Sequence, residues 1–121
     1  MNDQNVVILI GHVVREAQHR VTLKEIKMSW FIIVVNEDCY KDGVLIEKHN
    51  YFKVLLFDRM AEIYTDELKR GKFISIKGRL RQNEWEKDGE KRREIVVIGE
   101  HLQYLEKKNN RRSETDEYNQ Y

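Results

Sequence analysis

Residues 51–81 read YFKVLLFDRMAEIYTDELKRGKFISIKGRLR and change their hydrophobic period twice. Tyr51 to Phe57 is a short apolar run typical of a strand, and Phe73 to Leu80 alternates as a half-buried strand does. Between them, residues 59–70 place apolar side chains three and four positions apart, on one face of a helix. The stretch therefore predicts a strand, a helix and a strand in that order.

Signals at both ends of the predicted helix agree with its period. Asp58 precedes the helix and is expected to cap the free N–H groups of the first turn. Gly71 follows at the place of a C-terminal glycine, and Lys69 and Arg70 suit the negative end of the helix dipole. The helix is therefore expected to fill the whole distance from Asp58 to Gly71.

Further strands are expected on both sides of this stretch. Val6 to Val14 and Met28 to Val35 are apolar and rich in β-branched residues, and Glu94 to Ile98 begins a last strand that can extend to Leu105. Gly11, inside the first run, suggests a bulge or bend. The order of three strands, a helix and two strands predicts an all-β, five-stranded Greek-key barrel of the OB-fold type, with one helix between strands 3 and 4.

Turns are expected at Gly, Asn and Asp, because the chain contains no proline. Asp42-Gly43 and Asp88-Gly89 are strong hairpin-turn signals. The first of these lies in the polar stretch Asn36 to Asn50, which is interpreted as a long hairpin loop with the turn at its tip.

Length and composition indicate one domain. The chain has 121 residues, of which 40% are hydrophobic and 36% charged, which suits one modest core with a well-solvated surface. The formal net charge of +1 argues neither for nor against nucleic acid. From Lys107 onward the chain has no aliphatic residue and no periodicity. We expect a folded domain over residues 1–107 and a short disordered polar tail over 108–121.

The compartment is expected to be the cytoplasm. A single cysteine, Cys39, excludes a disulfide within the chain and suits a reducing environment. The first residues lack the basic and apolar regions of a signal peptide, and no apolar run approaches the ~20 residues that a membrane span needs.

Four stretches resemble the bacterial single-stranded-DNA-binding protein family, and together they span roughly residues 5 to 105. Residues 5–11 (NVVILIG), 31–36 (FIIVVN), 51–81 and 85–92 (WEKDGEKR) are similar to the family's first strand, second strand, central core and last hairpin. The resemblance implies a protein that binds single-stranded DNA without sequence specificity and protects it during replication, recombination and repair. It also implies a homotetramer, with a dimer as the fallback.

The sequence departs from the family pattern at several places. The segment from Arg15 to Lys27 lacks the usual Asp-Pro-Glu-x-Arg-Tyr, Phe52 replaces a usual histidine, and Asn83 and Glu84 stand where the family tends to be basic. The C-terminus ends in EYNQY. The family's acidic tip, which docks replication and repair proteins, is absent from this sequence.

Four aromatic residues are candidates for stacking on bases. A single strand exposes flat bases and a charged backbone, so a binder of any sequence needs rings and cations. By resemblance the rings are Tyr40, Tyr51, Phe57 and Trp85. Trp85 also stands out by itself, because its neighbours are polar and offer little core. Trp30 lies in a fully apolar run and is expected to be buried in the core or at a subunit contact instead.

Basic residues in the same parts of the chain are candidates for phosphate contacts. Lys77, Arg79 and Arg81 alternate with Leu80 and so should lie in a row on one side of a strand. The full set of candidates is Arg15, Arg20, Lys53, Arg59, Lys72, Lys77, Arg79 and Arg81.

Other functions are less well supported by the residues. The four histidines lack metal-ligand spacing, Cys39 has no CxxC partner, and no known catalytic motif occurs, so we expect no metal, no cofactor and no enzymatic activity. Two alternatives stay open. The chain could be a specialised OB-fold paralogue, such as a plasmid, phage or primosome accessory protein, or a protein-interaction module with weak DNA binding. The apolar run Met28 to Val35 independently suggests an oligomer, since both of its faces need covering.

Overall fold

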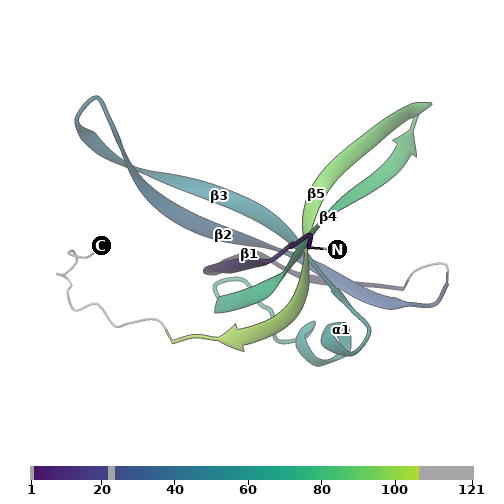
Figure 1. Cartoon of the computed structure of the whole chain (residues 1–121). Coiled ribbons are helices and arrows are strands. Elements are labelled where there is room, and N and C mark those ends of the chain that lie inside the picture. Colours follow the sequence, from purple (N-terminus) through teal and green to yellow (C-terminus); the bar gives the residue numbers. More distant parts are fainter. Residues whose placement is uncertain (1, 22–23, 107–121) are drawn as a thin grey trace.

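The chain folds into a closed five-stranded barrel with one short helix (Figure 1). The structure is a computed structural model and describes residues 2–21 and 24–106. The elements in chain order are β1 (Val7–Val21), β2 (Lys27–Lys41), β3 (Val44–Phe57), α1 (Arg59–Tyr64), β4 (Phe73–Lys87) and β5 (Glu90–Tyr104). Neighbouring strands follow the order β1-β2-β3-β5-β4 around the barrel. This confirms the predicted fold class, with the helix between β3 and β4.

Strand β1 closes the barrel by changing partners along its length. Its first half, from Val7 to His12, pairs with β4, and its second half, from His12 onward, pairs with β2. Gly11 lies at the changeover in regular register, and a Cβ there would collide with the carbonyl oxygen of Val34. The predicted bulge lies further along, in two register shifts between Val13 and Gln18. Gly11 therefore permits a close backbone approach rather than forming the bulge itself.

The polar stretch Asn36 to Asn50 is a paired hairpin, so the predicted loop is wrong. Strands β2 and β3 stay in unbroken register from the pair Met28–Phe57 to the pair Lys41–Val44. Only the predicted Asp42-Gly43 makes the turn, with φ values of 53° and 79°. Polar side chains misled the interpretation because this part of the hairpin extends beyond the core, where both faces meet water. The β4–β5 hairpin extends in the same way, in a different direction (Figure 1).

Helix α1 is much shorter than predicted and ends at Tyr64, not at Arg70. The following segment first makes local turn hydrogen bonds, such as those from the Glu67 and Leu68 N–H groups to the Tyr64 carbonyl, and then bonds to β1. The N–H of Gly71 donates to the carbonyl of Val13 at 2.7 Å, and the N–H of Val13 donates to the carbonyl of Lys72 at 2.8 Å. Apolar period alone therefore overestimated the helix, because pairing with β1 competes for the same backbone groups.

The predicted capping by Asp58 is also wrong, since its side chain makes no capping hydrogen bond. Asp58 has a φ of 52°, and its backbone joins two elements: its N–H donates to Lys27 and its carbonyl accepts from Glu62. Lys69 and Arg70 lie beyond the last turn of α1, outside the reach of its dipole. Among the described residues, no helix combines the length and apolar character that a membrane crossing needs.

Two apolar clusters lie on opposite sides of the β2–β3 wall. The larger one fills the barrel and consists of Val13, Phe31, Ile33, Val54, Leu56, Ala61, Leu68, Ile74, Ile76 and Val97. The smaller one contains Leu55, Val96 and Ile98, with Met28, Trp30 and Phe57 packed against it. The second cluster occupies the outward phase of the same strands, and it forms the floor of the surface described below.

We predict that Gly11→Ala destabilises the barrel. The added methyl group meets backbone of β2, which has no rotamer by which to yield, and overpacking of this kind typically costs about 1–3 kcal/mol. Urea unfolding followed by circular dichroism measures the change. Gly43→Asn is the matched control, because position 43 has open space and asparagine tolerates its positive φ. Equal stability of Gly11→Ala and the native chain would contradict the close approach.

Candidate nucleic-acid interface

Strands β2 and β3 bring several candidate residues onto one face of the barrel, called here the outer face. In an antiparallel ladder, directly opposite residues point to the same side. The pairs on this side are Met28–Phe57, Trp30–Leu55, Ile32–Lys53 and Val34–Tyr51. Three of the candidates, Tyr51, Lys53 and Phe57, therefore share a face with the second apolar cluster. By the same alternation, Tyr40 belongs to this face near the tip of the hairpin.

Strands β5 and β4 continue the outer face. Leu55 of β3 is in register with Ile98 of β5, and Ile98 is opposite Arg79 of β4. Along β4 the alternation then gives Arg81 and Trp85, whose register partners are Val96 and Arg92. The candidate rings and the cations Lys53, Arg79 and Arg81 thus occupy one phase of a continuous four-stranded surface.

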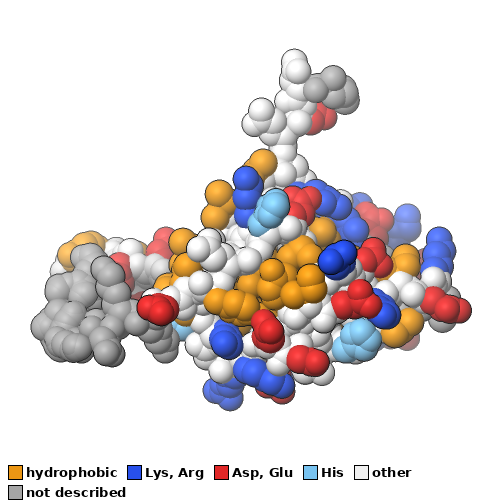
Figure 2. All heavy atoms as spheres, turned by 90° about the horizontal axis from the view of Figure 1, so that it is seen from below, with side chains coloured by type: hydrophobic (Ala, Val, Ile, Leu, Met, Phe, Trp, Pro, Cys, Tyr) orange, Lys and Arg blue, Asp and Glu red, His pale blue; other side chains and the backbone are white. Residues whose placement is uncertain are grey.

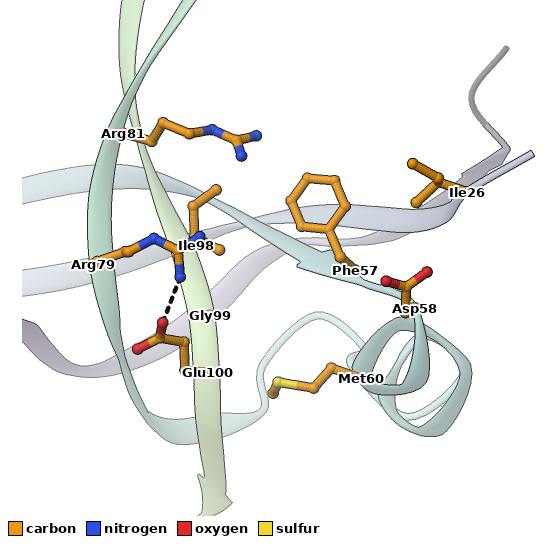
Figure 3. A pocket seen from close by; sticks show the side chains of 9 residues that line it. All are labelled: Ile26, Phe57, Asp58, Met60, Arg79, Arg81, Ile98, Gly99 and Glu100. Atoms are coloured by element: carbon orange, nitrogen blue, oxygen red, sulfur yellow. Dashed lines mark hydrogen bonds and ion pairs between the residues drawn. The ribbon is translucent and has the colours of Figure 1, made fainter. Parts of the chain in front are cut away.

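Two adjoining hollows form a groove in the outer face, and Phe57 and Arg81 line both of them. The first has a volume of about 550 Å³ and is lined by Ile26, Phe57, Asp58, Met60, Arg79, Arg81, Ile98, Gly99 and Glu100 (Figure 3). The second, of about 360 Å³, is lined by Arg20, Met28, Trp30, Lys53, Leu55, Phe57, Arg81 and Asn83. Phe57 lies between the two arginines of β4 on one side and Ile26 on the other (Figure 3).

Cations lie over the aromatic rings of this groove. The guanidinium carbon of Arg81 is 5.2 Å from the centre of the Phe57 ring. Arg15 and Lys53 lie at 4.9 and 4.8 Å from the centre of the Trp30 ring. Such contacts are attractive because the face of an aromatic ring is electron-rich. Each of these contacts therefore holds an aromatic ring and a cation side by side in the groove.

Carboxylates balance much of this positive charge. Glu94 lies 3.5 Å from the ammonium of Lys53, and Glu100 lies 2.5 Å from the guanidinium of Arg79, with side chains 34–45% exposed. Ion pairs as exposed as these contribute little to stability. The surface around α1 shows the same mixture of charge signs around apolar side chains (Figure 2). Two cations of the groove, Lys53 and Arg79, are thus paired with carboxylates.

Two titratable groups with shifted pKa values lie outside the groove lining. Lys27 hydrogen-bonds Glu62 and so lowers the pKa of that carboxyl, and the pair joins β2 to α1. Burial raises the pKa of the Tyr104 hydroxyl, and its hydrogen bond to Glu67 adds to the shift. These shifts belong to structural contacts, so they give no reason to infer acid–base chemistry.

The exposed aromatic candidates lie on the two hairpins. Tyr40 is 76% exposed, Tyr51 62% and Trp85 43%. They have the accessibility that stacking requires, but they do not line the two hollows. Arg15 and Arg20 of β1 do belong to the groove region, the former over Trp30 and the latter in the wall of the smaller hollow.

Three of the predicted cations lie elsewhere. Lys77 lines a separate hollow with Ile8 and His101, and Lys72 lies over the ring of Tyr104 at 5.0 Å. Arg59 begins α1 and is absent from the lining of both hollows. A role for these three residues in DNA contact stays a prediction, because none of them lines the two hollows of the groove.

Trp30 is the groove residue that the sequence reasoning missed. It is half-buried on the outer face rather than in the barrel core, where its neighbour Phe31 is fully buried. The alternation along the strand already indicated this placement, since Trp30 shares its face with Met28 and Ile32, and Phe31 points to the opposite face. Apolarity on both faces of a strand indicated that something covers the outer side, but not that rings and cations gather there.

Within residues 2–21 and 24–106, no group of three or more His, Cys, Asp or Glu side chains could hold a metal ion. The groove instead has an apolar floor, aromatic rings and cations. This set of side chains suits a ligand that is flat, and that carries negative charge beside its flat parts.

A Greek-key barrel with such a surface on its second and third strands is an OB-fold of the oligonucleotide-binding type. The chain belongs to the single-strand binding protein family, whose model matches residues 4–105.

Named relatives agree with this assignment. The chain is 29% identical over 105 residues to the single-stranded DNA-binding protein of Treponema pallidum, covering 87% of this chain and 60% of that protein. It is 30% identical over 106 residues to the protein of the same name from Thermotoga maritima, covering 86% of this chain and 75% of that one. A crystal structure of a deletion mutant of the Thermus aquaticus single-stranded DNA binding protein superposes with a TM-score of 0.75 at 33% identity, covering 85% of this chain and 51% of that one.

Proposed function

We propose that this chain binds single-stranded DNA without sequence specificity and protects it during replication, recombination and repair. The observation that carries the proposal is the placement of Phe57 beneath Arg81 where the two hollows meet, with further rings and cations along the same face. Membership of the single-strand binding protein family supports it, as do the relatives that carry this name.

The energetics of such a surface do not depend on the base. Stacking on an aromatic ring contributes about 1–3 kcal/mol per base, and every base has a π-face. Phosphate contacts release condensed counterions, which makes the affinity fall steeply with salt. Phe57 with Arg81 offers both kinds of contact within the groove. The exposed rings Tyr40, Tyr51 and Trp85 extend the surface along the hairpins.

The carboxylates of the groove favour a second candidate, a specialised paralogue or a protein-interaction module that binds DNA weakly. Glu94 and Glu100 form ion pairs with Lys53 and Arg79, and they compete with phosphates for these cations. A titration with oligo-dT at several salt concentrations separates the two functions. Tight binding at low salt with a steep salt dependence supports the main proposal, and failure to bind at low salt supports an interaction module.

The proposal describes a binding protein rather than an enzyme, and it requires no cofactor. It places the protein in the cytoplasm, where a cell without a nucleus keeps its DNA and where Cys39 stays reduced. It assigns DNA binding to residues 1–107. The expected tail, residues 108–121, lies outside the described residues.

We also propose that the chain assembles as a homo-oligomer, a tetramer or, failing that, a dimer. The sequence argument rested on Met28 to Val35, but the outward side of that run contributes to the groove. The support comes instead from the start of β1, where Val6, just before the strand, and Ile8 and Ile10 within it are 66%, 60% and 51% exposed. Such a row of exposed aliphatic side chains is typical of an interaction surface.

Substitution Phe57→Leu is expected to weaken oligo-dT binding about five- to fifty-fold. Leucine keeps an apolar group over Ile98 and the second cluster but removes the π-face, whose stacking is worth about 1–3 kcal/mol. Anisotropy of a labelled oligonucleotide at moderate salt measures the affinity. Trp85→Ala should weaken binding too without unfolding the chain. Unchanged affinity in both variants would remove these rings from the proposed surface.

Removal of a groove carboxylate is expected to tighten DNA binding. Glu94→Gln and Glu100→Gln each free a cation for phosphate, so we expect an affinity increase of about three- to ten-fold at low salt. Glu67→Gln is the matched control, because it changes net charge equally but contacts Tyr104 away from the groove. An equal gain in all three variants would point to net charge alone and contradict a local competition.

If the exposed aliphatic residues at the start of β1 form the subunit contact, a charge placed among them should disrupt the oligomer. Ile8→Lys should shift the chain toward the monomer in multi-angle light scattering, since a buried ammonium without a partner is costly. Val44→Lys, at the equally exposed tip of the β2–β3 hairpin, is the control and should leave the assembly intact. A monomeric native chain would overturn the proposed oligomer.

A further inference from the structure

The smaller hollow of the groove has the size and walls of a site for one flat ring system. Its volume of about 360 Å³ is near the lower end for pockets that take small molecules, about 300–1,000 Å³. Trp30 and Phe57 contribute aromatic walls, Met28 and Leu55 contribute aliphatic surface, and Asn83 contributes an amide. The volume is too small for a folded segment, so the walls fit a single planar group.

Cations surround this hollow on several sides. Arg20, Lys53 and Arg81 line it, and Arg15 lies over the Trp30 ring from strand β1. Only one carboxylate, that of Glu94, is paired with these cations by a described ion pair. A ligand that suits the hollow is therefore flat and uncharged at its centre and negatively charged on either side. A nucleobase between two backbone phosphates has this distribution of charge.

The contacts of Trp30 suggest how such a ligand would enter. Arg15 and Lys53 lie within 5 Å of the ring centre, so they cover part of the electron-rich ring. A phosphate is a stronger partner for a guanidinium or an ammonium than a ring is. Phosphates that reach Arg15 and Lys53 would draw these cations off the ring and leave its face free for stacking.

We propose that Trp30 and the hollow beside it form a binding subsite for one nucleobase, with the adjacent phosphates held by Arg15, Lys53, Arg20 and Arg81. The subsite rests on the proposed DNA binding and adds to it a residue whose ring becomes available as the backbone is bound. Trp30 is thus a base-contacting residue and not only packing for the second apolar cluster.

Tryptophan fluorescence tests the subsite directly, because the chain contains only two tryptophans. In Trp85→Phe the single emitter is Trp30, and position 85 keeps a ring. We expect saturating oligo-dT to quench this emission strongly. An abasic oligonucleotide of the same length, which has phosphates but no bases, should leave most of the emission unquenched. Unchanged emission with oligo-dT, or equal quenching by both ligands, would overturn the nucleobase subsite.

Affinity gives a second, independent readout. Trp30→Leu retains apolar packing over Leu55 and should lower oligo-dT affinity about five- to a hundred-fold, the loss expected for one stacked base. Trp30→Phe keeps a ring and should lose less. Thermal unfolding of each variant shows whether the barrel persists, and the fluorescence of Trp85→Phe decides the question if Trp30→Leu fails to fold. Equal affinity of folded Trp30→Leu and the native chain would overturn the subsite.

These measurements separate this subsite from the proposed function. If the native chain does not bind oligo-dT at low salt, the proposed function fails and the subsite fails with it. If the native chain binds and the Trp30 emission does not respond, only the subsite fails.

Discussion

Strands β2 and β3 must bury apolar side chains on both of their faces, and the rest of the molecule follows from this requirement. One face of the pair closes over the barrel core around Phe31 and Leu56. The other carries a second cluster that the barrel itself only partly covers. Since a sheet face of this kind is stable in water only when other groups shield it, long cations and aromatic rings lie across it. The proposed binding surface is thus the incompletely covered half of the protein's own hydrophobic packing.

The fold could be predicted from the sequence because its signals are local and periodic. The alternation from Phe73 to Leu80 and the two Asp-Gly turns placed strands and hairpins correctly. Two features could not be found in this way. The helix was overestimated because residues beyond Tyr64 bond to β1, which is distant in sequence. The hairpin Asn36 to Asn50 was taken for a loop because polar residues are equally at home in a strand that has water on both sides.

The candidate groove was only partly predictable for a related reason. Alternation along one strand grouped Arg79 with Arg81, but Trp30 needed the register between β2 and β3 to come beside Lys53. The ion partners Glu94 and Glu100 come from β5 and required the closed barrel. Sequence reasoning identified most of the residue types that the surface uses. The contacts that tune them, cation over ring and carboxylate beside cation, depend on the tertiary structure.

The β2–β3 hairpin pairs without a bulge from Met28–Phe57 to Lys41–Val44. Its length can therefore be changed by inserting matched residues into both strands. Because side chains repeat every two residues, inserting one residue in each strand would turn Tyr40 to the opposite side, whereas inserting two in each would carry it about 6–7 Å farther out on the same side. The reach of the hairpin can therefore be lengthened only in even increments. Proteins built on this barrel could cover longer or shorter stretches of a bound polymer in this way, without any change to the barrel that supports the hairpin.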